Sequence, residues 1–121
     1  MICAHAINLY LYAAPTAEPQ FLMATTVTAR NVTIMWDPPP MEQRNGIIRS
    51  YTIRYYPDSS EPEQPNEESV LGNLTSFSVD GLIPYTNYTF EVMAVTIDPG
   101  PPASIVVETD EAGKWSVDTK R

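Results

Sequence analysis

Cysteine is almost absent from this chain of 121 residues: Cys3 is the only one, so no disulfide can form within the chain. The fold must therefore be held by packing, and a domain of about 100 residues buries enough surface to be stable without cross-links. No apolar run approaches the length of a transmembrane helix, so direct membrane insertion is not expected. The cysteine count does not identify the compartment, because only a framework of paired cysteines would point to secretion.

Basic residues are also scarce, with seven Lys and Arg against fifteen Asp and Glu, for a net charge of −8. This excess repels nucleic acid and anionic membranes, so neither is expected as a partner. Part of the acidity lies in one loop, which includes Glu61, Glu63, Glu67 and Glu68. Their spacing, without a glycine, lacks the geometry of a calcium loop, and we expect no metal site there.

The chain has little that could carry out catalysis. His5 is its one histidine, and with Cys3 it would supply two metal ligands, whereas a structural zinc site needs four. A catalytic triad needs a rigidly held histidine, and His5 lies outside the predicted fold. There is no glycine-rich phosphate loop. We therefore expect neither an enzyme nor a cofactor.

Twelve prolines and a series of short alternating segments are what the chain does contain. Proline is typical of the ends and edges of strands, and alternation of apolar and polar residues indicates strands with one buried face. Seven such strands predict an all-β, antiparallel Greek-key β-sandwich of the immunoglobulin-like type. They are expected at residues 22–27, 32–36, 48–56, 68–71 (a short edge strand), 77–79, 88–95 and 105–109.

The alternation also predicts the core, because every second residue of each strand faces inward. Trp36 should lie between the sheets, and the hydroxyl of Tyr88 should return to the upstream backbone as in a tyrosine corner. The main structural residues are expected to be Trp36, Tyr51, Leu82, Pro84 and Tyr88. The full predicted core is Leu22, Ala24, Val27, Val32, Ile34, Trp36, Tyr51, Ile53, Tyr55, Phe77, Val79, Leu82, Tyr88, Phe90, Val92, Ala94, Ile105 and Val107.

Several of these residues together match a family pattern. A proline precedes the first strand, a tryptophan closes the second and is followed by prolines, and a Gly-Leu-x-Pro-x-Thr-x-Tyr run leads into the sixth. The matching residues are Pro19, Leu22, Trp36, Pro38, Pro39, Tyr51, Tyr55, Gly81, Leu82, Pro84, Thr86, Tyr88, Phe90, Val92, Ala94 and Thr109. The chain resembles a fibronectin type III domain over residues 19–110.

The resemblance implies the same sandwich and a non-catalytic module. Residues 1–18 would be a linker or the remnant of a preceding module, and residues 111–121 a tail or linker. A signal peptide at the start is disfavoured, because no basic residue opens the chain and the apolar run is interrupted by His5 and Asn8. A lead without structure of its own is the third alternative.

Three Asn-x-Thr sequons, at Asn31, Asn73 and Asn87, favour the secretory pathway, since composition alone predicts about one. Each falls at the end of a predicted strand, where a glycan can project into solvent. The alternative is that they are strand threonines that happen to follow asparagines.

Possible partner contacts are Arg54 and Tyr56, which face outward on the third strand, and Asp98 in the loop of residues 97–102. Arginine and tyrosine are enriched at interfaces. That loop lacks the Arg-Gly-Asp signal that adhesive members of the family carry. The loops of residues 37–46 and 97–102 are the expected contact regions.

The resemblance and the sequons predict a protein-binding or spacer module of an extracellular or cell-surface protein, such as a receptor, adhesion molecule or receptor-type phosphatase. Such a module would be monomeric, and its partners would be other proteins and the neighbouring domains of its parent chain. Two alternatives remain: a structural module of an intracellular filament or muscle protein, and an accessory domain of a secreted carbohydrate-active enzyme.

Overall fold

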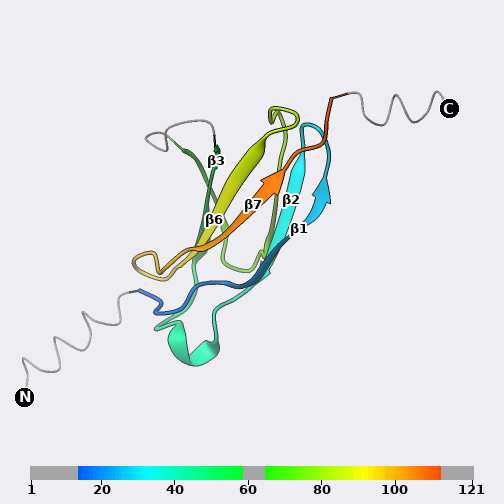
Figure 1. Cartoon of the computed structure of the whole chain (residues 1–121). Helices are drawn as coiled ribbons and strands as arrows, with labels where there is room; N and C mark the ends of the chain where they lie inside the picture. Colours follow the sequence, from blue (N-terminus) through cyan, green and yellow to red (C-terminus); the bar gives the residue numbers. More distant parts are fainter. Residues whose placement is uncertain (1–13, 59–64, 113–121) are drawn as a thin grey trace, which may run out of the picture.

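The computed structural model describes residues 14–58 and 65–112, and Figure 1 shows them as a sandwich of two antiparallel sheets. One sheet has the strand order β1–β2–β5 and the other the order β4–β3–β6–β7. The strands are β1 (Gln20–Val27), β2 (Val32–Asp37), β3 (Ser50–Pro57), β4 (Asn66–Leu71), β5 (Ser76–Val79), β6 (Asn87–Val95) and β7 (Ala103–Glu108). The predicted all-β fold with seven strands is confirmed.

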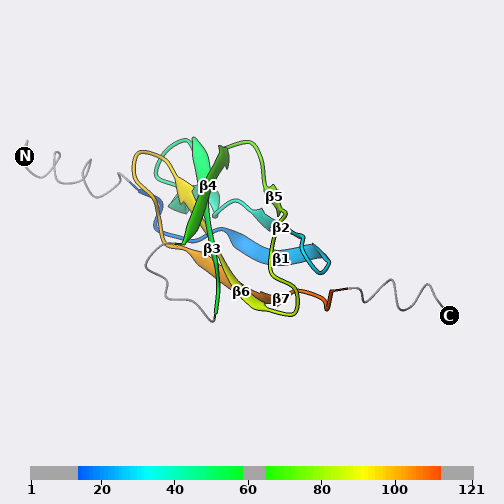
Figure 2. The same ribbon diagram turned by 90° about the horizontal axis from the view of Figure 1, so that it is seen from above.

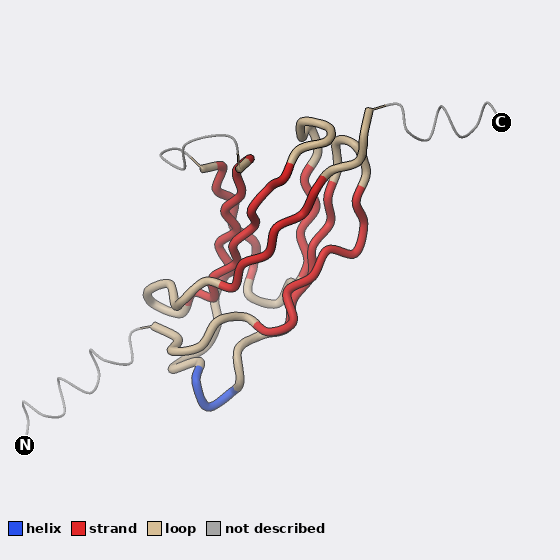
Figure 3. The backbone as a smooth tube through the Cα atoms, in the orientation of Figure 1, coloured by secondary structure: helices blue, strands red, loops and turns tan. Residues whose placement is uncertain are grey.

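Regular structure outside the strands is limited, within the described ranges, to one short 3₁₀ turn, η1 (Met41–Gln43), in the β2–β3 loop (Figure 3). The edge strand β4 is longer than predicted and pairs with β3 along its whole length, from Ser50↔Leu71 to Tyr55↔Asn66. The view from above in Figure 2 shows the two sheets as separate layers. The core must therefore lie between them.

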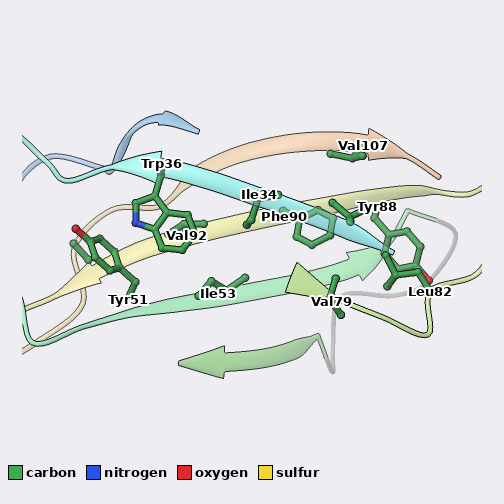
Figure 4. Close-up of a cluster of buried hydrophobic side chains, with 12 residues drawn as sticks. Ile34, Trp36, Tyr51, Ile53, Val79, Leu82, Tyr88, Phe90, Val92 and Val107 are labelled. Atoms are coloured by element: carbon green, nitrogen blue, oxygen red, sulfur yellow. The ribbon is translucent and has the colours of Figure 1, made fainter. Parts of the chain in front are cut away.

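All of the predicted core residues lie in one cluster between the sheets. Figure 4 shows the buried side chains of this cluster. Trp36 is only 1% exposed, and its ring meets that of Tyr51 edge-on, with centroids 5.2 Å apart. Leu82 and Tyr88 are buried at the other end of the same cluster, whereas Pro84 is half-buried. Partly buried residues at the margin complete the cluster: Leu22, Ala24, Val27, Ile48, Tyr55, Val70, Phe77 and Ile105.

The turn between β5 and β6 is held by two hydroxyl groups that bond the same residue. The Tyr88 hydroxyl accepts the N–H of Ile83 at 2.9 Å, which is the predicted tyrosine corner. The buried hydroxyl of Thr109 donates to the Ile83 carbonyl at 2.7 Å and accepts the N–H of Thr86 at 3.0 Å. Both backbone groups of Ile83 are thus satisfied by side chains from strand β6 and the end of β7.

Removing the Tyr88 hydroxyl should therefore weaken the fold. We expect Tyr88→Phe to lower the free energy of unfolding by about 1–3 kcal/mol, because a partly buried backbone N–H loses its acceptor. Tyr51→Phe is the matched control: the Tyr51 hydroxyl is buried and finds no hydrogen-bond partner in the described part of the chain. Its removal should cost less than about 0.5 kcal/mol. Urea unfolding of both variants measures the difference, and equal losses would contradict this role for Tyr88.

Two core tyrosines should also make stability depend on alkaline pH. Burial raises the pKa of Tyr51, an effect that the charge of Arg44 partly offsets. Burial, with a smaller effect of Glu68, raises the pKa of Tyr55. Below the unfolded pKa of about 10 both states are neutral and the full stability is present.

Above that pH the unfolded chain ionises first, so stability falls until the raised pKa of the folded state is passed. Melting temperature should therefore stay level between about pH 7 and 9 and decline above about pH 10. Thermal unfolding across this range tests the expectation, and Tyr51→Phe should make the alkaline decline shallower. A decline of unchanged slope in that variant would show that Tyr51 is not responsible.

The chain enters the domain at one end of the sandwich and leaves at the other (Figure 1). We call the first the proximal end, formed by residues 14–19 and the loops of residues 38–49, 72–75 and 96–102. Its N-terminal part is packed: Pro15, Ala17 and Pro19 are buried, and the N–H of Thr16 donates to the Gln43 carbonyl at 2.9 Å. This part of the predicted linker of residues 1–18 is therefore attached to the domain, while residues 1–13 and 113–121 lie outside the described ranges.

Candidate binding surfaces and glycosylation sites

The outer face of the four-stranded sheet does not offer Arg54 as a free cation. Its guanidinium donates to the Glu91 carboxylate at 2.8 Å and 3.1 Å, and both side chains are partly buried. Strand register places Glu67 opposite Arg54 on the other side, so the arginine stands between two acidic residues. Cross-strand pairing thus neutralises the charge of Arg54, and its contact with a partner stays a prediction.

Tyr56 and Asp98 lie at opposite ends of that sheet. Tyr56 is half-buried and pairs in register with Thr89, near the beginning of β6. Asp98 is exposed in the β6–β7 loop beyond the end of β6, and its carbonyl accepts the N–H of Thr96 at 3.4 Å. The structure therefore does not bring the three predicted contact residues together into one site.

The β6–β7 loop is a well-supported projection at the proximal end. The N–H of Gly100 donates to the Ala94 carbonyl at 2.9 Å, and Pro99 forms a bridge with Val95. Side chains of the loop nonetheless face solvent, among them Ile97, Asp98, Pro99, Pro101 and Pro102. Backbone bonds and prolines fix the loop, so little conformational entropy would be lost when a partner binds it.

Residues 14–19, which we call the N-terminal lead, pack closely against this loop. This packing depends on a glycine. A Cβ added at Gly100 would lie 2.8 Å from the Pro15 carbonyl oxygen and 2.9 Å from the Pro15 Cβ. The lead can therefore lie against the loop only because residue 100 has no side chain. In the sequence this glycine lies in the predicted loop of residues 97–102, and no local signal there points to a contact with Pro15.

The three sequons occupy different environments. Asn31 is half-buried, and its side-chain amide donates to the Asp80 carboxylate. Asn73, in the turn between β4 and β5, and Asn87, at the start of β6, are both exposed. Asn73 and Asn87 are accessible for a glycan as they stand, whereas a glycan at Asn31 would have to accommodate the bond to Asp80.

The described ranges hold no cluster of three or more His, Cys, Asp or Glu side chains suited to a metal ion. Glu61, Glu63, Cys3 and His5 lie outside those ranges. No helix in residues 14–58 or 65–112 is long and apolar enough to cross a membrane.

Comparison with known proteins agrees with this architecture. A family model described as "Fibronectin type III domain" matches residues 17–110. The chain is 33% identical over 100 residues to "Receptor-type tyrosine-protein phosphatase F" of Homo sapiens, covering 80% of this chain and 5% of that protein. It is 30% identical over 82 residues to "Cell adhesion molecule Dscam1" of Drosophila melanogaster, covering 68% of this chain and 4% of that protein.

A solved structure is similar as well: the solution structure of the fn3 domain of human contactin 1 has a TM-score of 0.71 and 28% identity, over 82% of both chains. The chain belongs to the fibronectin type III domain family. The fold of this family is that of a non-catalytic module. It spans about a twentieth of the length of the receptor-type phosphatases that it matches. The similarity lies in this module and carries no information about phosphatase chemistry.

Proposed function

We propose that this domain is a spacer and protein-binding module in the extracellular part of a cell-surface protein. The observation that carries the proposal is its in-line geometry. At the proximal end the chain is fixed through Ala14, whose carbonyl accepts the Asn45 side-chain amide at 3.0 Å. At the opposite end Asp110 is fixed, with its N–H donating to Thr28 and its carbonyl accepting from Tyr85.

Because the domain is anchored at Ala14 and at Asp110, a module of this kind sets both the position and the spacing of whatever is attached to it. The names of two similar proteins, a receptor-type phosphatase and a cell adhesion molecule, support a setting at the cell surface. For partner binding we favour the β6–β7 loop, whose exposed residues stand on a fixed backbone. The acidic outer sheet face is less suitable, since its arginine is already paired.

Glycosylation tests the proposed setting. When the chain is directed into the secretory pathway of mammalian cells, we expect intact mass to fall on enzymatic removal of N-glycans. Conversion of Asn to Asp should be found at Asn73 or Asn87, whose side chains are exposed. Peptide mass spectrometry identifies the converted residues, and Asn73→Gln with Asn87→Gln is the matched control. Secretion without glycans, or failure to be secreted, would contradict the proposal and favour an intracellular structural module.

A further inference from the structure

Asn45, at the proximal end, differs from the other asparagines of the chain in the residue that follows it. Gly46 follows Asn45, whereas a residue with a larger side chain follows each of the others: Asn8, Asn31, Asn66, Asn73 and Asn87. A backbone nitrogen can attack the side-chain carbonyl carbon of the asparagine before it, and a side chain on the attacking residue obstructs this approach. Glycine has no Cβ, so Asn45 is the asparagine of this chain most prone to cyclise.

The structure leaves the attacking nitrogen accessible. Gly46 is exposed, and its N–H has no hydrogen-bond acceptor within residues 14–58 and 65–112. Asn45 and Gly46 also line a hollow of about 270 Å³ that lies open to solvent between the β2–β3 and β6–β7 loops. Water can therefore reach both residues, and a small product can leave.

The side chain of Asn45, in contrast, is held by the N-terminal lead. Its amide nitrogen donates to the Ala14 carbonyl oxygen at 3.0 Å. Cyclisation expels this same nitrogen as ammonia, so the reaction cannot be completed without breaking the bond to Ala14. The lead is itself packed, through Pro15 against Gly100 and through the bond from the Thr16 N–H to the β2–β3 loop. While it stays packed, the lead should slow the reaction.

We propose that Asn45 is a site of spontaneous deamidation, and that the packed N-terminal lead controls its rate. The Gly46 nitrogen attacks Asn45 Cγ and forms a C–N bond, the bond from Cγ to the side-chain nitrogen breaks, and ammonia leaves with the proton from Gly46. Water then opens the cyclic imide to aspartate or isoaspartate, so the reaction needs no oxidant or reductant. The inference does not rest on the proposed function, because water is the only co-reactant.

The product would no longer hold the lead. A carboxylate is an acceptor only, so it cannot donate to the Ala14 carbonyl oxygen as the amide does. It also places a negative charge beside that oxygen. Deamidation would therefore release Ala14 and loosen the chain where it enters the domain, and the change would not reverse by itself.

Incubation of the full 121-residue chain in mildly alkaline buffer, followed by peptide mass spectrometry, measures deamidation at each asparagine. We expect Asn45 to convert before the others. Gly100→Ala would place a Cβ 2.8 Å from the Pro15 carbonyl oxygen and displace the lead. It should speed conversion of Asn45 by roughly 2–10-fold, the factor that one hydrogen bond contributes. Gly81→Ala is the matched control, because a Cβ there meets nothing within 4 Å, and it should leave the rate unchanged.

Two results of this incubation would overturn the proposal. Conversion of Asn45 no faster than that of Asn73 would show that Asn45 is not a deamidation site. Equal rates for Asn45 in the unmodified chain and in Gly100→Ala would show that the lead does not control the reaction.

Hydrogen exchange at the Thr16 amide gives a second readout that does not use Gly100→Ala. This N–H donates to the Gln43 carbonyl oxygen at 2.9 Å. Asn45→Asp, which reproduces one product, should raise its exchange rate by roughly 2–10-fold. Asn45→Gly, which removes the bond without adding a charge and tolerates the φ of 55°, should raise it less. The Leu82 amide, bonded at the opposite end of the sandwich, is the internal control. Unchanged exchange at Thr16 in Asn45→Asp would overturn the release of the lead.

Discussion

Trp36→Ala should lower the free energy of unfolding by about 3–5 kcal/mol, the largest loss we expect from a single substitution here. Trp36 stands on β2 between the sheets, is 1% exposed and packs edge-on against Tyr51. Truncation removes this contact and leaves a cavity that two hydrogen-bonded sheets cannot close without distortion. Natural domains have about 5–15 kcal/mol of stability in total, so the variant should be only marginally folded.

Equilibrium unfolding in urea, followed by far-UV circular dichroism, measures this loss. Met35→Ala is the matched control, because Met35 is the neighbouring residue on β2, points away from the core and is 40% exposed. It should change stability by less than about 1 kcal/mol. Trp36→Phe should fall between the two, since it keeps an aromatic ring in the cavity. A loss below about 1 kcal/mol for Trp36→Ala would show that the sheets repack around the gap.

The strands and the core could be predicted from sequence because each strand buries one face. Alternation along residues 32–36 and 88–95 specifies which side chains point inward, whatever their partners are. Trp36 and Tyr88 could be given their roles because family resemblance and spacing agreed. The hydroxyl bond from Ile83 to Tyr88 followed from the same pattern.

Contacts that depend on cross-strand register were not predictable in the same way. The sequence predicts Arg54 to be an outward-facing cation. Only the pairing of β3 with β6 shows that Glu91 lies beside it. The packing of residues 14–18 could not be predicted either. Prolines there indicate extended backbone, but an unattached linker and a packed segment are both extended. Gly100, more than 80 residues away in sequence, is what allows the lead to pack.

Glycines show this limit most sharply. Gly81 belongs to the family motif and has a φ of 77°, and a Cβ built there meets nothing within 4 Å. Gly72 lies in an unremarkable Leu-Gly-Asn turn, yet a Cβ built there would lie 2.1 Å from the Ile48 carbonyl oxygen. The sequence singles out the first glycine, whereas steric space in the folded chain singles out the second.

Gly72→Ala should therefore be the second most damaging change, with a loss of about 3 kcal/mol. The added methyl would also come within 2.9 Å of the Arg49 carbonyl carbon, so it meets backbone that cannot rotate away. To make room, the β4–β5 turn must move from the start of β3. That movement strains or breaks the bond from the Gly72 N–H to the Arg49 carbonyl, now 2.9 Å.

Gly81→Ala is the matched control, since it adds the same methyl at a position with open space but positive φ. It should cost about 1 kcal/mol, from backbone strain less the entropy that alanine removes from the unfolded chain. Denaturant unfolding ranks the two variants, and hydrogen exchange at the amides of residues 69–72 should rise in Gly72→Ala alone. If Gly81→Ala were the more damaging, backbone conformation and not the close approach to Ile48 would limit these turns.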